Sequence, residues 1–301
     1  MNRYCGRFAP TPSGPLHFGS MIAAIASYCD ARANDGTWHV RIDDIDKPRI
    51  VAGAAEDILR TLTAYGLEWD GRLVYQSRKT DSYHTAIHML RSSAQVFACS
   101  CSRKDINEAA DTGTDHPLYP GTCRNGLRPG KSARSLRLRV DDDTRVGFID
   151  LLQGPVSQQL ASEVGDFVLY RSGSIFSYHL ACSVDDAQQG VTHIVRGSDL
   201  IESTPRQVHL QNLLGLATPA YLHLPVATND QGQKMSKQHG ARGVDNTRPG
   251  KVIHSVLRFL GQQPPPDLAQ VPARAAIEWA VHNWRRENLP KARAIAETSI
   301  V

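Results

Sequence analysis

Residues 7–20 read RFAPTPSGPLHFGS, and this stretch decides the fold class. It begins as a short apolar strand, passes through a turn rich in proline and glycine, and leads into the apolar stretch from Met21 to Tyr28. A strand, a turn and a helix in this order direct free backbone N–H groups and the positive end of a helix toward an anion. The stretch therefore predicts a nucleotide-phosphate site, with His17 as an added donor and Gly19 allowing the nucleotide to lie close to the backbone.

A second motif, Lys234-Met235-Ser236-Lys237, lies far along the chain from His17 (234 − 17 = 217). Its two ammonium groups can meet the charge that develops on a pyrophosphate leaving group, although such a motif alone could be a solvated loop. Together and in this order, the two motifs predict a divided ATP site. The expected catalytic residues are His17, Lys234 and Lys237, and the expected ATP-binding residues are His17, Gly19, Ser20 and Lys237.

Strands and helices alternate over most of the chain, which predicts an α/β fold with a doubly wound parallel sheet. Strands are expected at residues 6–9, 38–42, 74–76, 167–170, 192–195 and 221–224, and helices at 18–33, 52–65, 83–91, near 180, and at 204–214, 252–260 and 273–287. Residues 99–160 break this alternation and are expected to form an insertion. The predicted parts are a first catalytic half (1–98), the insertion (99–160), a second catalytic half (161–240) and a short helical tail (241–301).

Composition excludes few functions. A hydrophobic content of 41% and a charged content of 21% are ordinary for a globular protein. The sequence shows neither an apolar run of about 20 residues nor a signal-peptide pattern, so a cytoplasmic protein without a membrane partner is expected. The net charge of +4 is only mildly basic. A local basic run, which is either a solvated hairpin or a phosphate-contacting face, consists of Arg124, Arg128, Lys131, Arg134, Arg137 and Arg139.

Three of the six cysteines are clustered within 25 residues (123 − 99 + 1): Cys99, Cys101 and Cys123. Zinc is usually held by four ligands in a tetrahedron, so this spacing indicates a zinc site with one further ligand. Both His116 and Tyr119 are candidates for the fourth position, and three free thiols in a loop are the alternative.

Further segments resemble the class I aminoacyl-tRNA synthetases of the glutamyl type. Residues 41–49 read RIDDIDKPR and resemble that family's RIEDxDxxR segment, SYHL and SVDD at residues 177–186 resemble its tyrosine-bearing helix, and THIVRGSDL at residues 192–200 resembles its THVIRGxD/E strand and turn. The resemblance covers residues 5 to about 240. It implies a Rossmann-type catalytic domain that forms an acyl-adenylate from ATP, with magnesium on the pyrophosphate.

The resemblance also implies a set of ligand contacts. Arg7 and Arg196 can pair with a carboxylate, and Asp43 can accept the ammonium group, although the family usually has Glu at that position. The alternative for Arg196 is a surface ion pair with Asp199. The implied glutamate contacts are Arg7, Phe8, Ala9, Pro10, Thr11, Asp43, Tyr178 and Arg196, and the implied ligands of one structural zinc are Cys99, Cys101, Tyr119 and Cys123.

The remaining 61 residues (301 − 240) are fewer than the anticodon-binding part of a glutamyl-tRNA synthetase needs. This resembles a truncated branch of the family that attaches glutamate to the queuosine base of tRNA(Asp). The expected partners are thus ATP, L-glutamate and tRNA(Asp) carrying queuosine, bound by a monomer, with the basic run following the stem phosphates. The alternatives are a compact enzyme that charges a tRNA 3′ end and a nucleotide-binding module without catalysis.

Overall fold

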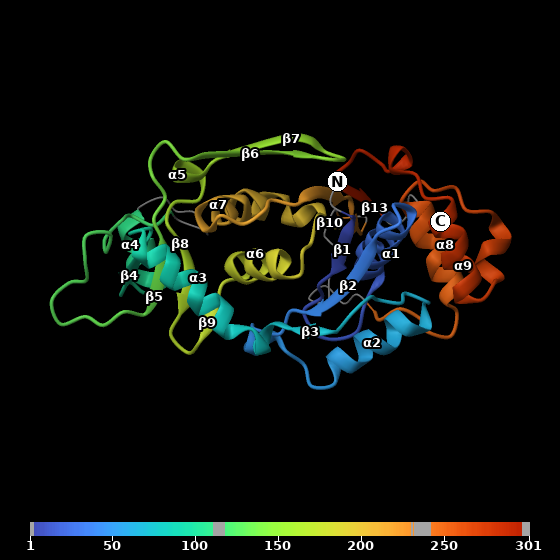
Figure 1. Cartoon of the computed structure of the whole chain (residues 1–301), viewed down its shortest axis with the longest axis horizontal. Helices are drawn as coiled ribbons and strands as arrows, with labels where there is room; N and C mark the ends of the chain where they lie inside the picture. Colours follow the sequence, from blue (N-terminus) through green and yellow to red (C-terminus); the bar gives the residue numbers. More distant parts are fainter. Residues whose placement is uncertain (1–2, 111–117, 230, 232–241, 297–301) are drawn as a thin grey trace.

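A computed structural model describes residues 3–110, 118–229, 231 and 242–296 (Figure 1). His116, Lys234 and Lys237 lie outside the described residues. Within these ranges, no helix has the length and apolar character that crossing a membrane requires.

Parallel strands form the centre of the molecule. Strands β1, β2 and β3 pair in that order, and β10 pairs in parallel with β11. The backbone N–H of Thr192 donates to the carbonyl of Cys5 at 2.9 Å, so β1 lies beside β10. The resulting order 3-2-1-10-11 confirms the predicted doubly wound α/β class. The strand expected at residues 167–170 forms, but it pairs antiparallel with its neighbours in a separate sheet. The bounds are β1 Cys5–Phe8, β2 Thr37–Ile42, β3 Val74–Tyr75, β10 His193–Gly197 and β11 Ala220–Leu224.

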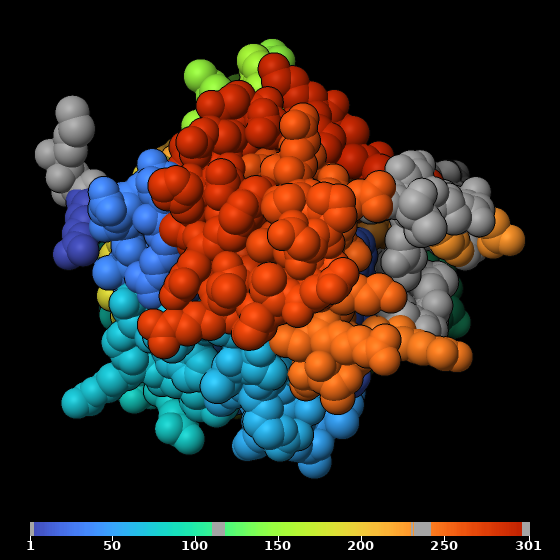
Figure 2. Space-filling model, turned by 90° about the vertical axis from the view of Figure 1, so that its right-hand side faces the viewer, coloured from blue at the N-terminus to red at the C-terminus, as the bar shows by residue number. Residues whose placement is uncertain are grey.

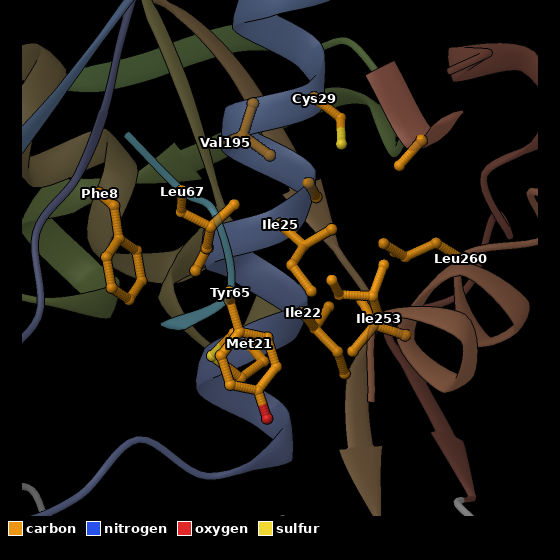
Figure 3. Packing of buried hydrophobic residues seen from close by; sticks show 14 of the residues in the cluster. Phe8, Met21, Ile22, Ile25, Cys29, Tyr65, Leu67, Val195, Ile253 and Leu260 are labelled. Atoms are coloured by element: carbon orange, nitrogen blue, oxygen red, sulfur yellow. The ribbon is translucent and has the colours of Figure 1, made fainter. Parts of the chain in front are cut away.

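Helix α1 (Phe18–Ala33) lies in the middle of the main core because apolar residues cover most of its surface. Figure 3 shows Met21, Ile25 and Cys29 of this helix among side chains from the sheet and from the C-terminal helices. The other helices are α2 Ala54–Ala64, α3 Thr80–Ser92, α4 Arg103–Ala110, α5 Leu160–Glu163, α6 Tyr178–Gln188, α7 Thr204–Leu214, α8 Pro249–Phe259 and α9 Ala273–His282.

An antiparallel sheet and a hairpin extend from this centre, the sheet at one end of the molecule and the hairpin along one side (Figure 1). The sheet has the order β4-β5-β8-β9, and the hairpin β6-β7 meets the parallel strands where Asp150 pairs with Tyr221. The bounds are β4 Val96–Cys99, β5 Ser135–Leu138, β6 Arg145–Asp150, β7 Gly154–Gln159, β8 Phe167–Arg171, β9 Ile175–Phe176, β12 Val226–Thr228 and β13 Ala294–Ala296.

The C-terminal segment, residues 242–296, covers the end of the molecule opposite the antiparallel sheet (Figures 1 and 2). It is tied to α1 by Asp30, a fully buried carboxylate that accepts from Trp284 Nε1 at 3.0 Å and from Arg286 Nε at 2.6 Å. Tyr4 donates its hydroxyl to the same carboxylate. The helix expected at residues 273–287 therefore ends earlier, at His282, because the following chain turns to bring Trp284 and Arg286 to Asp30.

Candidate active site

The N-terminus of α1 faces a cavity of about 640 Å³. His17 is the N-cap of this helix, and its Nδ1 accepts the backbone N–H of Ser20 at 3.3 Å. Because Nδ1 is the acceptor, a neutral imidazole carries its proton on Nε2, which is then a donor. The cavity is lined on one side by Thr11, His17, Gly19 and Ser20, so the structure brings together the predicted residues of the first ATP motif.

A second cavity, of about 600 Å³, lies between the parallel strands and the antiparallel sheet. Asp43 and Tyr178, both predicted glutamate contacts, line it. Thr11 and Arg49 line both cavities, so the two spaces adjoin at these residues. Of the other predicted contacts, Phe8 and Pro10 line the first cavity, and Ala9 directly follows β1.

Behind the second cavity lies a buried ionic network centred on Arg41. This fully buried arginine pairs with Asp43 at 2.7 Å and with Asp186 at 2.6 Å, and Arg7 pairs with Asp186 at 3.2 Å. Burial raises the pKa of Asp186, but Arg7 and Arg41 outweigh it and hold this pKa below its usual value. At Asp43, burial outweighs Arg41 and raises the pKa. Predicted contacts Arg7 and Asp43 are thus linked through Arg41 and Asp186, two residues for which sequence reasoning assigned no role.

Arg196 of β10 is only 4% exposed, so it is not the surface residue of the ion-pair alternative. Its guanidinium donates to Tyr178 at 3.1 Å and to His223 Nε2 at 3.0 Å. It also donates to Thr204 and to Gln207, both at 2.8 Å. These bonds use four of the five N–H groups, and the fifth is on Nη1, the nitrogen that contacts Tyr178. With these bonds in place Arg196 offers a ligand one N–H group, rather than the two that a bidentate pair needs.

The predicted metal ligands converge at the edge of the antiparallel sheet. The sulfur atoms of Cys99, Cys101 and Cys123 all lie within 4.8 Å of one another. The hydroxyl of Tyr119 lies 3.4 Å from Cys99 Sγ and accepts the backbone N–H of Cys123 at 2.8 Å. Burial alone would raise the pKa of Cys123, but hydrogen bonds, led by that of Tyr119, bring it to about 7.

These donors fit a tetrahedral metal ion. Ligand distances of about 2.3 Å in a tetrahedron place two thiolate sulfurs about 3.8 Å apart. Cys101 Sγ and Cys123 Sγ are separated by 3.7 Å. The three cysteines can therefore hold a metal, with the phenol of Tyr119 beside them.

The basic run is not one continuous solvent-facing surface. Arg124 forms a double ion pair with Asp166 at 2.6 and 2.7 Å, and Arg137 lies over the ring of Tyr119 at 4.1 Å. Arg139 donates to the backbone carbonyl of Arg124. These three arginines connect β5 and the residues beside it with Tyr119 and Asp166. The exposed members of the run are Arg128, Lys131 and Arg134.

Comparison with known proteins places this site in a family. Residues 5–254 match the family described as tRNA synthetases class I (E and Q), catalytic domain. A glutamyl-Q tRNA(Asp) synthetase from Aromatoleum aromaticum is 51% identical over 288 residues, covering 96% of this chain and 91% of the relative. One from Geobacter sulfurreducens is 47% identical and covers 96% of this chain and 94% of the relative.

Solved structures show the same fold. A glutamate tRNA ligase from Elizabethkingia meningosepticum superposes with a TM-score of 0.81 at 21% sequence identity, covering 97% of this chain and 66% of that one. A glutamate-tRNA synthetase from Elizabethkingia anophelis gives a TM-score of 0.82 at the same identity. The chain thus spans about two thirds of the length of these structures. With half its residues identical to close relatives over almost their whole length, the chain belongs to the glutamyl-Q tRNA(Asp) synthetase branch of the class I (E and Q) tRNA synthetase family.

Proposed function

We propose that the protein activates L-glutamate with ATP and transfers the glutamyl group to the queuosine base in the anticodon of tRNA(Asp). The observation that carries this proposal is the pair of cavities that adjoin at Thr11 and Arg49. One lies at a helix N-terminus suited to phosphates, and the other is lined by groups suited to an amino acid. Queuosine of tRNA(Asp) as the acceptor is supported by the relatives, which are named glutamyl-Q tRNA(Asp) synthetases.

ATP would bind at α1, with the Nε2–H of His17 and the first N–H groups of the helix directed at its phosphates. Gly19 and Ser20 line this cavity and would lie along the nucleotide. Lys234 and Lys237 would stabilise the charge on the departing pyrophosphate, with Lys237 as the closer contact. Magnesium would neutralise part of the phosphate charge.

Glutamate would lie in the second cavity. Asp43 would accept its ammonium group, while Tyr178 and the Nη1 of Arg196 would donate to a carboxylate. The α-carboxylate then attacks the α-phosphorus of ATP, and pyrophosphate leaves. In the second step a hydroxyl of the queuosine cyclopentene diol attacks the acyl carbon, and AMP leaves. No protein nucleophile is needed, so positioning and electrostatics would supply the rate.

Zinc, at one ion per chain, is the proposed occupant of the cysteine cluster. Three thiolates and a phenol would fill all four coordination positions of zinc and leave none for a substrate or water, so the ion would be structural. It would link the end of β4 to the chain at Cys123. We further propose a cytoplasmic monomer, in which residues 99–160 are an insertion between the catalytic segments 1–98 and 161–240 and residues 241–301 form a helical tail.

The test is to incubate the protein with ATP, radiolabelled glutamate and tRNA from cells with and without queuosine. Label should enter tRNA(Asp) only when queuosine is present. Equal labelling of both tRNA(Asp) preparations would overturn the proposed acceptor. Label at the 3′ end of tRNA(Glu) would indicate a compact glutamyl-tRNA synthetase. Absence of both labelling and ATP–pyrophosphate exchange would indicate a module without catalysis.

A further inference from the structure

Two buried residues outside the recognised motifs, Asp150 and His223, stand behind Arg196. His223 lies in β11 and is fully buried, and Asp150 ends β6 and is 2% exposed. His223 Nδ1 lies 2.6 Å from Asp150 Oδ2, and His223 Nε2 accepts from Arg196 Nε at 3.0 Å. We infer that Asp150 and His223 are positioning residues that fix the orientation of Arg196 toward glutamate. This inference rests on the proposed function, in which Arg196 contacts the amino acid.

Asp150 is held as an acceptor by the surrounding backbone. Its Oδ1 accepts the N–H groups of Leu152 at 3.0 Å and of Gln153 at 2.9 Å, and the N–H of His223 lies 3.1 Å from Oδ2. Burial raises the pKa of Asp150, but the hydrogen bonds from His223 and the backbone outweigh it and lower this pKa. An ionised Asp150 requires a proton on the imidazole nitrogen that faces it, which is Nδ1.

This proton fixes the tautomer of His223. With the proton on Nδ1, the neutral ring presents a lone pair at Nε2, which is the acceptor that the Nε–H of Arg196 needs. The other tautomer would place two N–H groups against each other at 3.0 Å. Thr204 Oγ1 also lies 3.1 Å from Nε2 and accepts from Arg196 Nη2. Asp150 therefore acts on the guanidinium through a single imidazole orientation.

The guanidinium of Arg196 has its less occupied edge, at Nη1, on the substrate side. His223 engages Nε, and Thr204 and Gln207 engage Nη2. Nη1 is left facing Tyr178, which lines the second cavity together with Asp43. Without the bond at Nε, only the contacts at Nη2 and with Tyr178 would hold the guanidinium, so its plane would be less firmly fixed and Nη1 less well placed for a carboxylate.

Two substitutions of His223 separate its two contacts. In His223→Gln the side-chain carbonyl can reach the position of Nε2 and still accept from Arg196, but the donor to Asp150 is lost. In His223→Asn the amide can still donate to Asp150, but the acceptor for Arg196 is lost. The readout is the Kd for L-glutamate by isothermal titration calorimetry, with thermal melting of each variant.

If positioning is the role, His223→Asn should weaken glutamate binding by at least about tenfold, as loss of a hydrogen bond to a charged group does. His223→Gln should stay within about threefold of the wild type. In ATP–pyrophosphate exchange, the KM for glutamate should rise in His223→Asn while the KM for ATP stays the same. If His223 only satisfies Asp150, His223→Gln should bind glutamate more weakly than His223→Asn. That result, or equal glutamate binding by the two variants, would overturn the inference. A wild-type protein that binds no glutamate would instead overturn the proposed function, and the inference with it.

A second measurement does not depend on the His223 variants folding. Nitrogen-15 NMR of labelled histidine in the wild-type protein should show His223 protonated at Nδ1 and unprotonated at Nε2. Because Leu152 and Gln153 hold the Oδ1 position as an acceptor, Asp150→Asn places its NH₂ group against Nδ1 and moves the proton to Nε2. The NMR signals should exchange character, and glutamate affinity should fall as in His223→Asn. A wild-type His223 with its proton on Nε2 contradicts the inference directly.

Discussion

At the scale of single residues, Asp185 lies beside the buried ionic network, 3.7 Å from Arg41 Nε, and its carboxyl group is poorly satisfied. Asp185 is 1% exposed, and its Oδ2 accepts from Gln76 and Tyr83, both at 2.8 Å. Its Oδ1 has no hydrogen-bond partner among the described residues. Burial outweighs the nearby Arg41 and raises the pKa of Asp185 to about 6. An aspartate in the unfolded chain has a pKa near ~3.9, so folding favours the protonated form.

Replacing Asp185 by Asn should therefore stabilise the protein in a pH-dependent way. In the wild type, the stabilisation that comes from a protonated Asp185 is fully present below about pH 4. It is lost as the pH rises to about 6, the pKa of this group in the folded protein. Asp185→Asn removes this loss, so the variant should be more stable than the wild type by about 1–3 kcal/mol above pH 6. The difference should vanish below about pH 4. Urea unfolding of both proteins between pH 4 and pH 8 measures it.

The control is Asp142→Asn, which changes an exposed aspartate. Its difference from the wild type should stay within about 0.5 kcal/mol at every pH. A stability difference for Asp185→Asn that does not change between pH 4 and pH 7 would rule out the proposed protonation.

At the scale of elements, we expect a metal ion in the cysteine cluster to stabilise the antiparallel sheet. Cys99 ends β4, and the sheet has only short strands to hold it together. The purified protein should contain about one zinc ion per chain, and Cys123→Ser should lose it. Cys123→Ser should also speed amide hydrogen exchange in β4 and β5, measured by mass spectrometry. Cys5→Ser, which changes a cysteine of β1, should keep the metal, and a zinc-free wild-type protein would refute the site.

The exposed part of the basic run allows a separate test of tRNA binding. Replacing Arg128, Lys131 and Arg134 together by alanine should weaken tRNA binding and reduce the dependence of log K on log salt by up to about 3, about one per lost phosphate contact. Filter binding at several salt concentrations measures both effects. The matched control is the triple alanine variant at exposed positions Arg60, Arg72 and Arg274, near α2 and α9. Equal loss in both variants would mean that net charge alone, rather than this surface, attracts the tRNA.

Elements whose signals are local could be predicted from the sequence. The strand ending at Phe8 and helix α1 follow from an apolar strand, a turn and an apolar helix in direct succession. The three cysteines also lie close together in the sequence. Arg41 and Asp186 are 145 positions apart and Asp150 and His223 are 73 apart, so neither pair leaves a spacing pattern. Only the folded sheet brings such pairs together, which is why sequence reasoning proposed Arg7, Asp43 and Arg196 as glutamate contacts but not the residues that pair with them.

At the scale of the whole molecule, Asp30 joins the first helix to the last part of the described chain. Asp30→Ala would leave Trp284 and Arg286 without their shared acceptor. The free energy of unfolding should fall by about 3–5 kcal/mol, as when one partner of a buried ion pair is removed. Protease cleavage near residues 284–288 should also become faster. Glu278→Ala, which breaks an exposed pair with Arg274, should change stability by less than about 0.5 kcal/mol. Equal effects of the two changes would contradict a special role for Asp30.

The contact of Asp30 with Trp284 and Arg286 also affects how the protein folds during its synthesis on the ribosome. Trp284 follows Asp30 by 254 residues, and at a synthesis rate of about 5–20 residues per second it emerges roughly 13–50 s later. During that interval α1 is complete, but its acid lacks two partners and its apolar surface lacks α8 and α9. The face of α1 that packs on α8 and α9 must therefore stay exposed, or be held by a chaperone, until residues 284–286 have been made, even if the sheet already covers its other side.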